Sequence, residues 1–149
     1  METISKITHS TGETEQIGAL LAKEIALEAS LPRFIALYGD LGVGKTAFVR
    51  GFVSALADGV KVKSPTFTLV NEYRTKPTPV FHFDMYRIDG EDDLYSIGFY
   101  DYLDRGICIT EWTEKIEFAL PDSYFRVTIS KNDPDDTDSR EVKTELIEK

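Results

Sequence analysis

The sequence predicts a single α/β domain with a mixed parallel and antiparallel sheet flanked by helices. Three observations favour this class. Apolar runs of strand length alternate with amphipathic segments of helix length. A glycine-rich turn joins one such run to a helical segment, and two β-type stretches near the C-terminus have the spacing of a hairpin. At 149 residues and 42% hydrophobic content the chain can bury one core, so we expect residues 1–149 to form one domain.

The N-terminal half contains two helical patterns around one strand. Ser10 and Glu13 have the spacing of a capping box, and the apolar stripe that follows predicts a helix to about Ala29. The apolar run 34–38 predicts a strand. A second helix is expected after the glycine-rich turn, ending near residues 58–59.

The C-terminal half mixes hairpins with one buried strand. Runs 68–73 and 80–84, joined by a proline-containing turn, predict an antiparallel pair. Acidic residues that suit the helix dipole open a helix expected over 89–104. The remaining expected elements are a buried strand at 106–110, a short helix at 114–120, and a closing hairpin of 124–130 and 141–147 with a mobile polar tip at 131–139.

Residues 39–46, GDLGVGKT, match the phosphate-binding loop pattern G-x-x-x-x-G-K-[ST]. The flanking strand and helix are the setting that this motif requires, because its backbone N–H groups and the helix N-terminus then face a phosphate. Lys45 is expected to reach the β and γ oxygens, and Thr46 to offer its hydroxyl to Mg²⁺. The sequence therefore predicts a nucleotide site on a P-loop NTPase-like domain.

Two carboxylates follow predicted strands. Asp84 closes the run 80–83 and Glu111 closes the run 106–110. Ligands of open α/β sheets gather at the carboxyl ends of strands, where such groups bind Mg²⁺ or orient the attacking water. Glu111 is the stronger metal candidate because its strand is purely apolar. Thr66, in the connector after the loop helix, lies where phosphate-loop proteins hold a segment that senses the γ-phosphate.

Composition restricts the classes of function. The net charge of −9 argues against direct binding of nucleic acid on a broad basic face. The lone Cys108 lies in an apolar run and is expected to be a buried structural thiol, and His82, between two phenylalanines, a satisfied structural histidine. With no segment of signal-peptide or membrane-spanning character, we expect a cytoplasmic protein.

Four motifs in this order resemble the bacterial TsaE (YjeE) family, the ATPase component of tRNA threonylcarbamoyladenosine biosynthesis. They are GDLGVGKT at 39–46, SPTFTLVNEY at 64–73, HFDMYR at 82–87 and EWTE at 111–114. The resemblance implies a cytoplasmic ATP-binding protein with a modified P-loop fold. It also implies two partner proteins, TsaB and TsaD, with which the family forms the threonylcarbamoyl group on the adenosine next to the anticodon.

The resemblance also implies roles for single residues. Thr46 and Glu111 would bind Mg²⁺, Asp84 would lie close to the metal, and Thr66 would belong to a nucleotide-sensitive segment. Trp112 matches a tryptophan beside the site. Two departures from the family pattern are Ala47, where a second threonine is frequent, and Thr113, where proline is common. The residues implied to contact ATP are Asp40, Leu41, Gly42, Val43, Gly44, Lys45, Thr46, Thr11, Glu114 and Arg140, and those implied to act in catalysis are Lys45, Thr66, Asp84 and Glu111.

Two other functions remain open at the level of sequence. A small-molecule kinase uses the same loop, although the seven scattered arginines do not indicate an arginine-rich lid. A GTP-type switch protein uses it too, although neither D-x-x-G after the hairpin nor N-K-x-D occurs in the chain. We therefore expect an ATPase whose hydrolysis depends on its protein partners.

Overall fold

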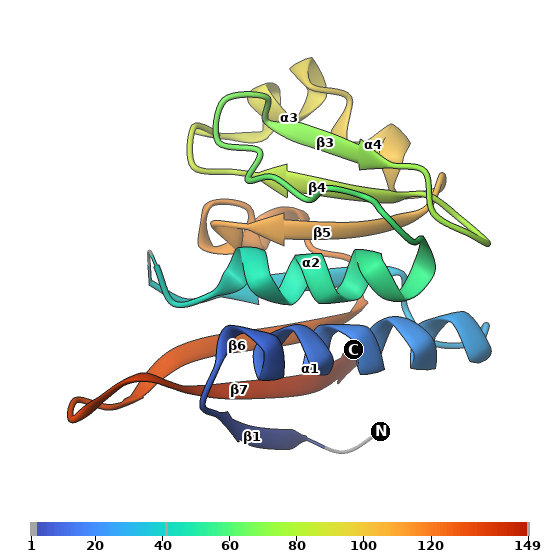
Figure 1. Ribbon diagram of the computed structural model, residues 1–149. Helices are drawn as coiled ribbons and strands as arrows, with labels where there is room; N and C mark the ends of the chain where they lie inside the picture. The colour runs from blue at the N-terminus through green and yellow to red at the C-terminus, as the bar shows by residue number, and fades with distance from the viewer. Residues whose placement is uncertain (1–2, 41, 149) are drawn as a thin grey trace.

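A computed structural model describes residues 3–40 and 42–148 of the chain. Its centre is a seven-stranded sheet with the strand order β1-β7-β6-β2-β5-β4-β3 (Figure 1). The pairs β2–β5, β2–β6 and β4–β5 are parallel, whereas β3–β4, β6–β7 and β1–β7 are antiparallel. The predicted mixed α/β sheet is therefore confirmed. The strands are β1 (Ile4–Thr8), β2 (Phe34–Tyr38), β3 (Val70–Tyr73), β4 (Val80–Asp84), β5 (Ile107–Glu111), β6 (Ser123–Asp133) and β7 (Asp136–Glu148).

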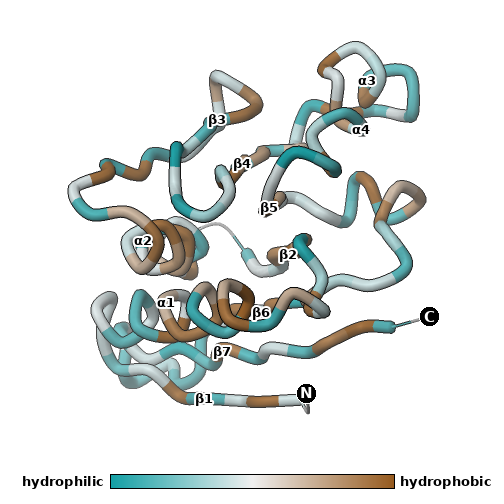
Figure 2. Tube along the Cα trace, turned by 90° about the vertical axis from the view of Figure 1, so that its right-hand side faces the viewer, coloured by the Kyte–Doolittle hydropathy of each residue, from teal (hydrophilic) through white to brown (hydrophobic). Residues whose placement is uncertain are grey.

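Helices cover both faces of the sheet. On one face lie α1 (Thr11–Leu27) and α2 (Lys45–Leu56), and on the other lie α3 (Glu91–Ser96) and α4 (Phe99–Tyr102), as Figure 2 shows from the side. Two short 3₁₀ helices, η1 (Thr113–Lys115) and η2 (Glu117–Ala119), follow β5. Because β2, β4 and β5 run parallel, their carboxyl ends lie at the same end of the sheet.

Residues of β2 alternate between two apolar clusters because successive side chains of a strand point to opposite faces. Ile35 and Leu37 pack with buried residues of α1 and α2, whereas Phe34 and Ala36 pack with the aromatic cluster beneath α3 and α4. Each of these four side chains is buried, as expected for a parallel strand covered on both faces. This burial fixes the end of β2, and with it the start of the glycine-rich turn.

The helices α1 and α2 touch through glycines. A Cβ atom on Gly18 would collide with the carbonyl oxygen of Phe48, and one on Gly51 would collide with that of Glu15. Only hydrogen atoms fit between the two backbones at these points. This close approach places the N-terminus of α1 beside that of α2, where the glycine-rich turn ends.

Four expectations from the sequence need correction. The helix expected over 89–104 is two short helices, because Gly98 adopts a left-handed conformation with φ of 73° between them. The helix expected at 114–120 is η1 and η2. The polar tip expected at 131–139 is largely strand, since β6 and β7 pair up to Asp133 and Asp136. The strand β1, which pairs with β7, was not predicted.

Cys108 is buried on β5, as predicted, and its Sγ donates to the carbonyl oxygen of Tyr102 at 3.6 Å. Burial raises the pKa of this thiol to about 12. No helix in the described part of the chain is both long and apolar enough to cross a membrane.

Candidate nucleotide site

The glycine-rich turn leaves β2 and enters α2 directly. Gly39, Gly42 and Gly44 have φ values of 145°, 80° and 108°, which side chains with a Cβ rarely adopt. A Cβ on Gly39 would also collide with the carbonyl oxygen of Ile129 on β6. The positive φ favours glycine at all three positions, and the close approach adds a second requirement for glycine at Gly39.

Lys45 is the first residue of α2 and its side chain is almost completely buried. Its Nζ donates to the carbonyl oxygen of Gly39 at 2.8 Å and lies 5.4 Å from the ring centroid of Trp112. The ammonium group therefore spans the mouth of the turn between a carbonyl group and an aromatic face, both of which attract a cation.

The two predicted carboxylates face each other across neighbouring strands. Asp84 ends β4, Glu111 ends β5, and the two residues are partners in the parallel register. Each is only 7% exposed. Asp84 Oδ1 accepts from the backbone N–H of Tyr86 at 2.9 Å, and Glu111 Oε2 lies 2.5 Å from Nε2 of His82. One oxygen of each carboxylate is thus engaged by the protein.

These groups line one cavity of about 340 Å³. Its walls come from the start of α1, the turn that continues into α2, the connector before β3, and the ends of β4 and β5, so five separate segments of chain meet there. The lining residues are Thr11, Gly42, Gly44, Lys45, Thr46, Ala47, Arg50, Ser64, Thr66, Asp84, Glu111 and Trp112.

The oxygen atoms of this cavity fit Mg²⁺. The Thr46 hydroxyl and the carboxylates of Asp84 and Glu111 are hard ligands, and Mg²⁺ on a nucleotide takes only one or two carboxylates beside phosphate and water. Among the described residues no group of three or more His, Cys, Asp or Glu side chains could hold a metal by itself. Phosphate oxygens of a bound nucleotide would add to these ligands.

The turn after β5 is held in an unusual conformation. Trp112 has φ of 57°, in the left-handed region, and its ring packs on Tyr86 at 4.9 Å between centroids. Thr113, which follows, is fully buried, and its hydroxyl lies 3.0 Å from the carbonyl oxygen of Leu37 and 2.8 Å from the Thr110 hydroxyl. The threonine at the position where proline is common thus ties the end of β5 to the end of β2.

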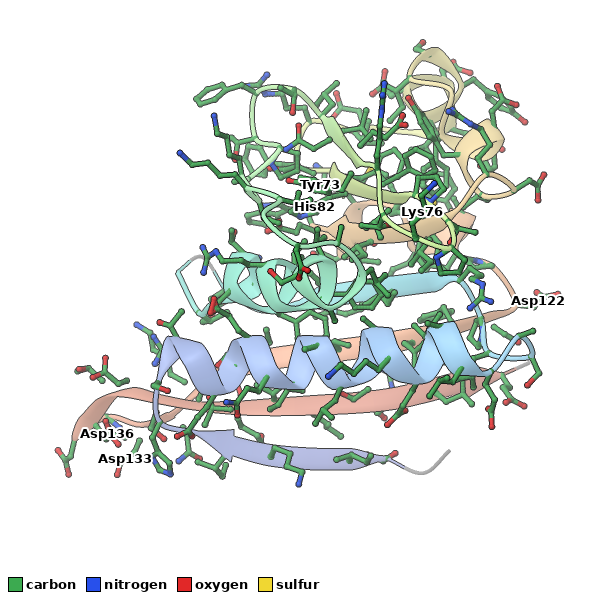
Figure 3. The ribbon with its side chains drawn as sticks, turned by 45° about the vertical axis from the view of Figure 1, so that its right-hand side comes forward. Tyr73, Lys76, His82, Asp122, Asp133 and Asp136 are labelled. Atoms are coloured by element: carbon green, nitrogen blue, oxygen red, sulfur yellow. The ribbon has the colours of Figure 1, made fainter. Side chains whose placement is uncertain are left out.

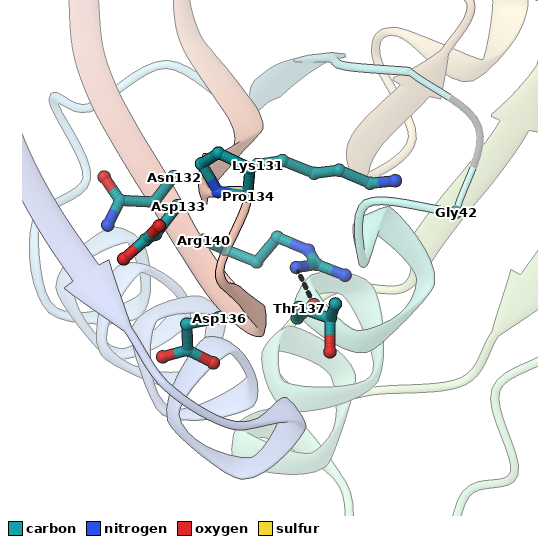
Figure 4. Close-up of a pocket in the computed structure, with 8 residues that line it drawn as sticks. All are labelled: Gly42, Lys131, Asn132, Asp133, Pro134, Asp136, Thr137 and Arg140. Atoms are coloured by element: carbon teal, nitrogen blue, oxygen red, sulfur yellow. Dashed lines mark hydrogen bonds between the residues drawn. The ribbon is translucent and has the colours of Figure 1, made fainter.

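Arg140 on β7 approaches the turn from the other side. Its Nε donates to the carbonyl oxygen of Val43 at 3.0 Å, and its Nη1 donates to that of Thr137 at 2.7 Å. It lines a second cavity of about 400 Å³ between Gly42 and the tip of the β6–β7 hairpin (Figure 4). Arg140 therefore contacts the phosphate loop, but from a neighbouring cavity.

The other predicted residues differ in their positions. Thr11, Lys45, Thr46, Thr66 and both carboxylates meet in the 340 Å³ cavity, together with Gly42 and Gly44. Val43 lines a small cavity beside it with Thr11 and Arg140, and Asp40 belongs to the turn. Glu114 is exposed on η1 and lines none of these cavities. Burial of Tyr38, together with the charges of Glu117 and Glu114, raises the pKa of the Tyr38 phenol. Leu41 lies outside the described residues.

Sequence reasoning missed Arg50, Ser64 and His82 as parts of the site. Arg50 lies four residues after Thr46 on α2, so helical spacing could have placed the two on one face. Its Nη1 lies 3.3 Å from Glu15 Oε1 on α1. The prediction that His82 is a satisfied structural histidine is half right: the ring is buried and bound to Glu111, but its Nδ1 has no partner among the described residues.

A turn of this kind between a buried parallel strand and a helix, opposite acidic ends of two further strands, is the architecture of the P-loop NTPase-like class. A crystal structure of Bacillus subtilis YdiB has the same fold, with a TM-score of 0.73 and 29% identity over 98% of this chain and 86% of that one.

The family follows from the sequence comparison. The model of the family described as threonylcarbamoyl adenosine biosynthesis protein TsaE matches residues 8–142, and the chain belongs to this family. The tRNA threonylcarbamoyladenosine biosynthesis protein TsaE of Haemophilus influenzae is 39% identical over 113 residues, which cover 74% of this chain and 72% of that protein. The Bacillus subtilis protein of the same name is 37% identical over 117 residues, or 78% and 73% of the two chains.

Proposed function

We propose that this chain is a cytoplasmic, Mg²⁺-dependent ATPase domain that acts with TsaB and TsaD. Its role would be in forming the threonylcarbamoyl group on the adenosine next to the anticodon of tRNA. The names of its relatives support the pathway. The observation that carries the ATPase assignment is the single cavity in which Lys45, Thr46, Asp84 and Glu111 meet at the phosphate loop.

The proposed mechanism assigns a separate task to each of these groups. The backbone N–H groups of residues 42–46 and the N-terminus of α2 would bind the phosphates, and Lys45 would exchange the Gly39 carbonyl for β and γ oxygens. Bound Mg²⁺, held by Thr46 and Glu111, would neutralise charge that develops on those oxygens. Asp84 would orient the water that attacks the γ-phosphorus and accept its proton, so that the bond to the leaving ADP oxygen breaks.

The dependence on partners rests on what the cavity offers to the transferring phosphoryl group. Among the residues that line the 340 Å³ cavity, Arg50 is the arginine. Its Nη1 donates to Glu15 Oε1 at 3.3 Å, so this guanidinium group is already engaged by a carboxylate. An arginine that stabilises the transition state is frequently supplied in trans and is worth about 10³–10⁵ in rate. We therefore expect the chain alone to bind ATP and ADP but to hydrolyse ATP slowly, with TsaB and TsaD raising the rate.

The test compares ATP turnover by the purified chain with and without TsaB and TsaD. The wild type should be slow alone and clearly faster with both partners, and Lys45→Ala should lose the stimulated rate. The matched control is Lys23→Ala, an exposed lysine on α1 outside the nucleotide cavity. An ATP turnover rate that is the same with and without TsaB and TsaD would refute the partner dependence. Preference for GTP would favour a switch protein, and phosphate transfer to added metabolites would favour a kinase.

A further inference from the structure

His82 is fully buried on β4, within the half of the sheet that Figure 3 shows above α2. In the parallel register His82 is the partner of Ile109 and Asp84 is the partner of Glu111. Because alternate residues of a strand share a face, His82 lies diagonally behind the two carboxylates on the same face of the sheet. Its Nε2 reaches Glu111 Oε2 at 2.5 Å.

The ring makes no second hydrogen bond. Nδ1 of His82 is the buried side-chain polar atom that has no partner among the described residues. A buried N–H without an acceptor costs more than a buried lone pair without a donor, so the favoured tautomer carries its proton on Nε2 and donates it to Glu111. The hydrogen bond of the His82 ring is therefore the one to Glu111 Oε2.

We propose that His82 is a positioning residue for the metal. By holding Oε2 of Glu111, it fixes the rotation of the carboxylate and reserves Oε1 for Mg²⁺. This inference rests on the proposed function, because it assigns a use to the Mg²⁺ that ATP would bring. The same logic applies to histidines and carboxylates behind metal ligands elsewhere, where loss of the outer partner typically costs about 10–100-fold in metal affinity.

The test uses two amide side chains of different reach. In His82→Gln the amide nitrogen can occupy the position of Nε2, whereas in His82→Asn it reaches only as far as Nδ1. ATP affinity is measured calorimetrically for each variant and the wild type, first in EDTA and then at stepped Mg²⁺ concentrations. Glutamine should retain the Mg²⁺ response, and asparagine should shift it to Mg²⁺ concentrations about 10–100-fold higher with ATP affinity in EDTA unchanged.

Several outcomes contradict the proposal. A wild-type Mg²⁺ response in His82→Asn would overturn it, and so would an equal loss in both variants or a loss of ATP affinity in EDTA as well. A second measurement needs no variant: ¹⁵N NMR of histidine-labelled wild type, which has only His9 besides His82, should show the Nε2–H tautomer. The Nδ1–H tautomer would also overturn it. If the ATP affinity of the wild type is the same with and without Mg²⁺, the proposed function itself is refuted, and this inference with it.

Discussion

At the scale of single residues, two neighbouring carboxylates differ in what holds them. Asp84 accepts from the backbone N–H of Tyr86, two residues ahead in its own turn. Glu111 is held by the side chain of His82 from the adjacent strand. The first contact lies within one segment of the chain, whereas the second joins two neighbouring strands of the sheet. Under the proposed function, the contact across the sheet would orient the Glu111 carboxylate for the metal, and Asp84 would orient the attacking water.

Glu111→Gln keeps the shape of the side chain but removes its charge, so we expect the folded protein to bind ATP with a much smaller response to Mg²⁺. The shift should be roughly tenfold or more, at least as large as the loss of an outer-shell partner. Calorimetric titration of ATP with and without Mg²⁺ measures it. Glu24→Gln, on an exposed part of α1, is the matched control. An unchanged Mg²⁺ response would remove Glu111 from the metal site.

At the scale of elements, the contact between α1 and α2 positions the phosphate loop. Gly18 and Gly51 let the two helix backbones touch, and Thr11 at the start of α1 then lies in the same cavity as Thr46. A second tie is Arg140, which links β7 to the loop through the carbonyl oxygen of Val43. The loop is thus held by elements distant in sequence as well as by its own strand and helix.

Gly51→Ala should destabilise the protein by about 3 kcal/mol or more, because the added methyl group would meet the rigid backbone carbonyl of Glu15. Gly12→Ala is the control: its Cβ would find only Ser10 Oγ at 3.9 Å, and we expect a change within about 1 kcal/mol. Urea unfolding of both variants measures the effect. Equal stabilities would show that the helices separate at little cost.

The β6–β7 hairpin carries a bidentate pair in which Arg126 Nε and Nη2 donate to Glu145 Oε1 and Oε2 at 3.1 and 3.2 Å. The hydrogen bonds from Arg126 lower the pKa of the Glu145 carboxyl. A lowered folded-state pKa stabilises the fold above the ordinary carboxyl pKa of about 4.3, and this contribution disappears as the pH falls through the folded value.

The free energy of unfolding of wild type should therefore exceed that of Glu145→Gln by up to about 1 kcal/mol at neutral pH, a small value because the pair is partly exposed. The difference should shrink towards zero in acid. Urea titrations at pH 7, 5 and 3 would follow it, with Glu148→Gln, exposed on the same strand, as control. A difference that grows in acid would contradict the assignment.

At the scale of the whole molecule, the charge is the dominant property. The net charge of −9 is spread over 26 acidic and 17 basic residues, and the cavity gathers Lys45 and Arg50 at the phosphate loop. The same cavity holds Asp84 and Glu111, so the local positive potential for a nucleotide would come from the N–H groups of the loop, Lys45 and the proposed Mg²⁺, although the molecule as a whole repels polyanions. Contact with tRNA in the proposed pathway would then pass through partner proteins.

We accordingly expect the isolated chain to bind tRNA only weakly at about 150 mM salt, since a tight complex would have to neutralise several phosphates. Filter binding of labelled tRNA over a range of salt concentrations tests this, with the TsaB–TsaD mixture as the comparison. Tight binding by the isolated chain that weakens steeply with salt would show that a basic surface exists after all.

The sequence alone determined the elements whose signals are local. The apolar run of β2, the cap at Ser10, the glycines of the phosphate loop and the strand-end carboxylates all lie where the sequence predicts, because neighbouring residues set their backbone preferences and periodicity. The family resemblance rests on the same local motifs, and the comparisons confirm it.

Only the tertiary structure decided what depends on register and on contacts between distant segments. The unpredicted strand β1 and the extended hairpin tip exist because backbone groups pair with β7 and β6, which local composition does not report. The contact between His82 and Glu111 joins residues 29 apart and follows from the β4–β5 register. Strand pairing and helix packing therefore decided which polar groups meet in the cavity. They fix distances between residues that lie far apart in the sequence, and the spacing of residues along the chain does not predict such distances.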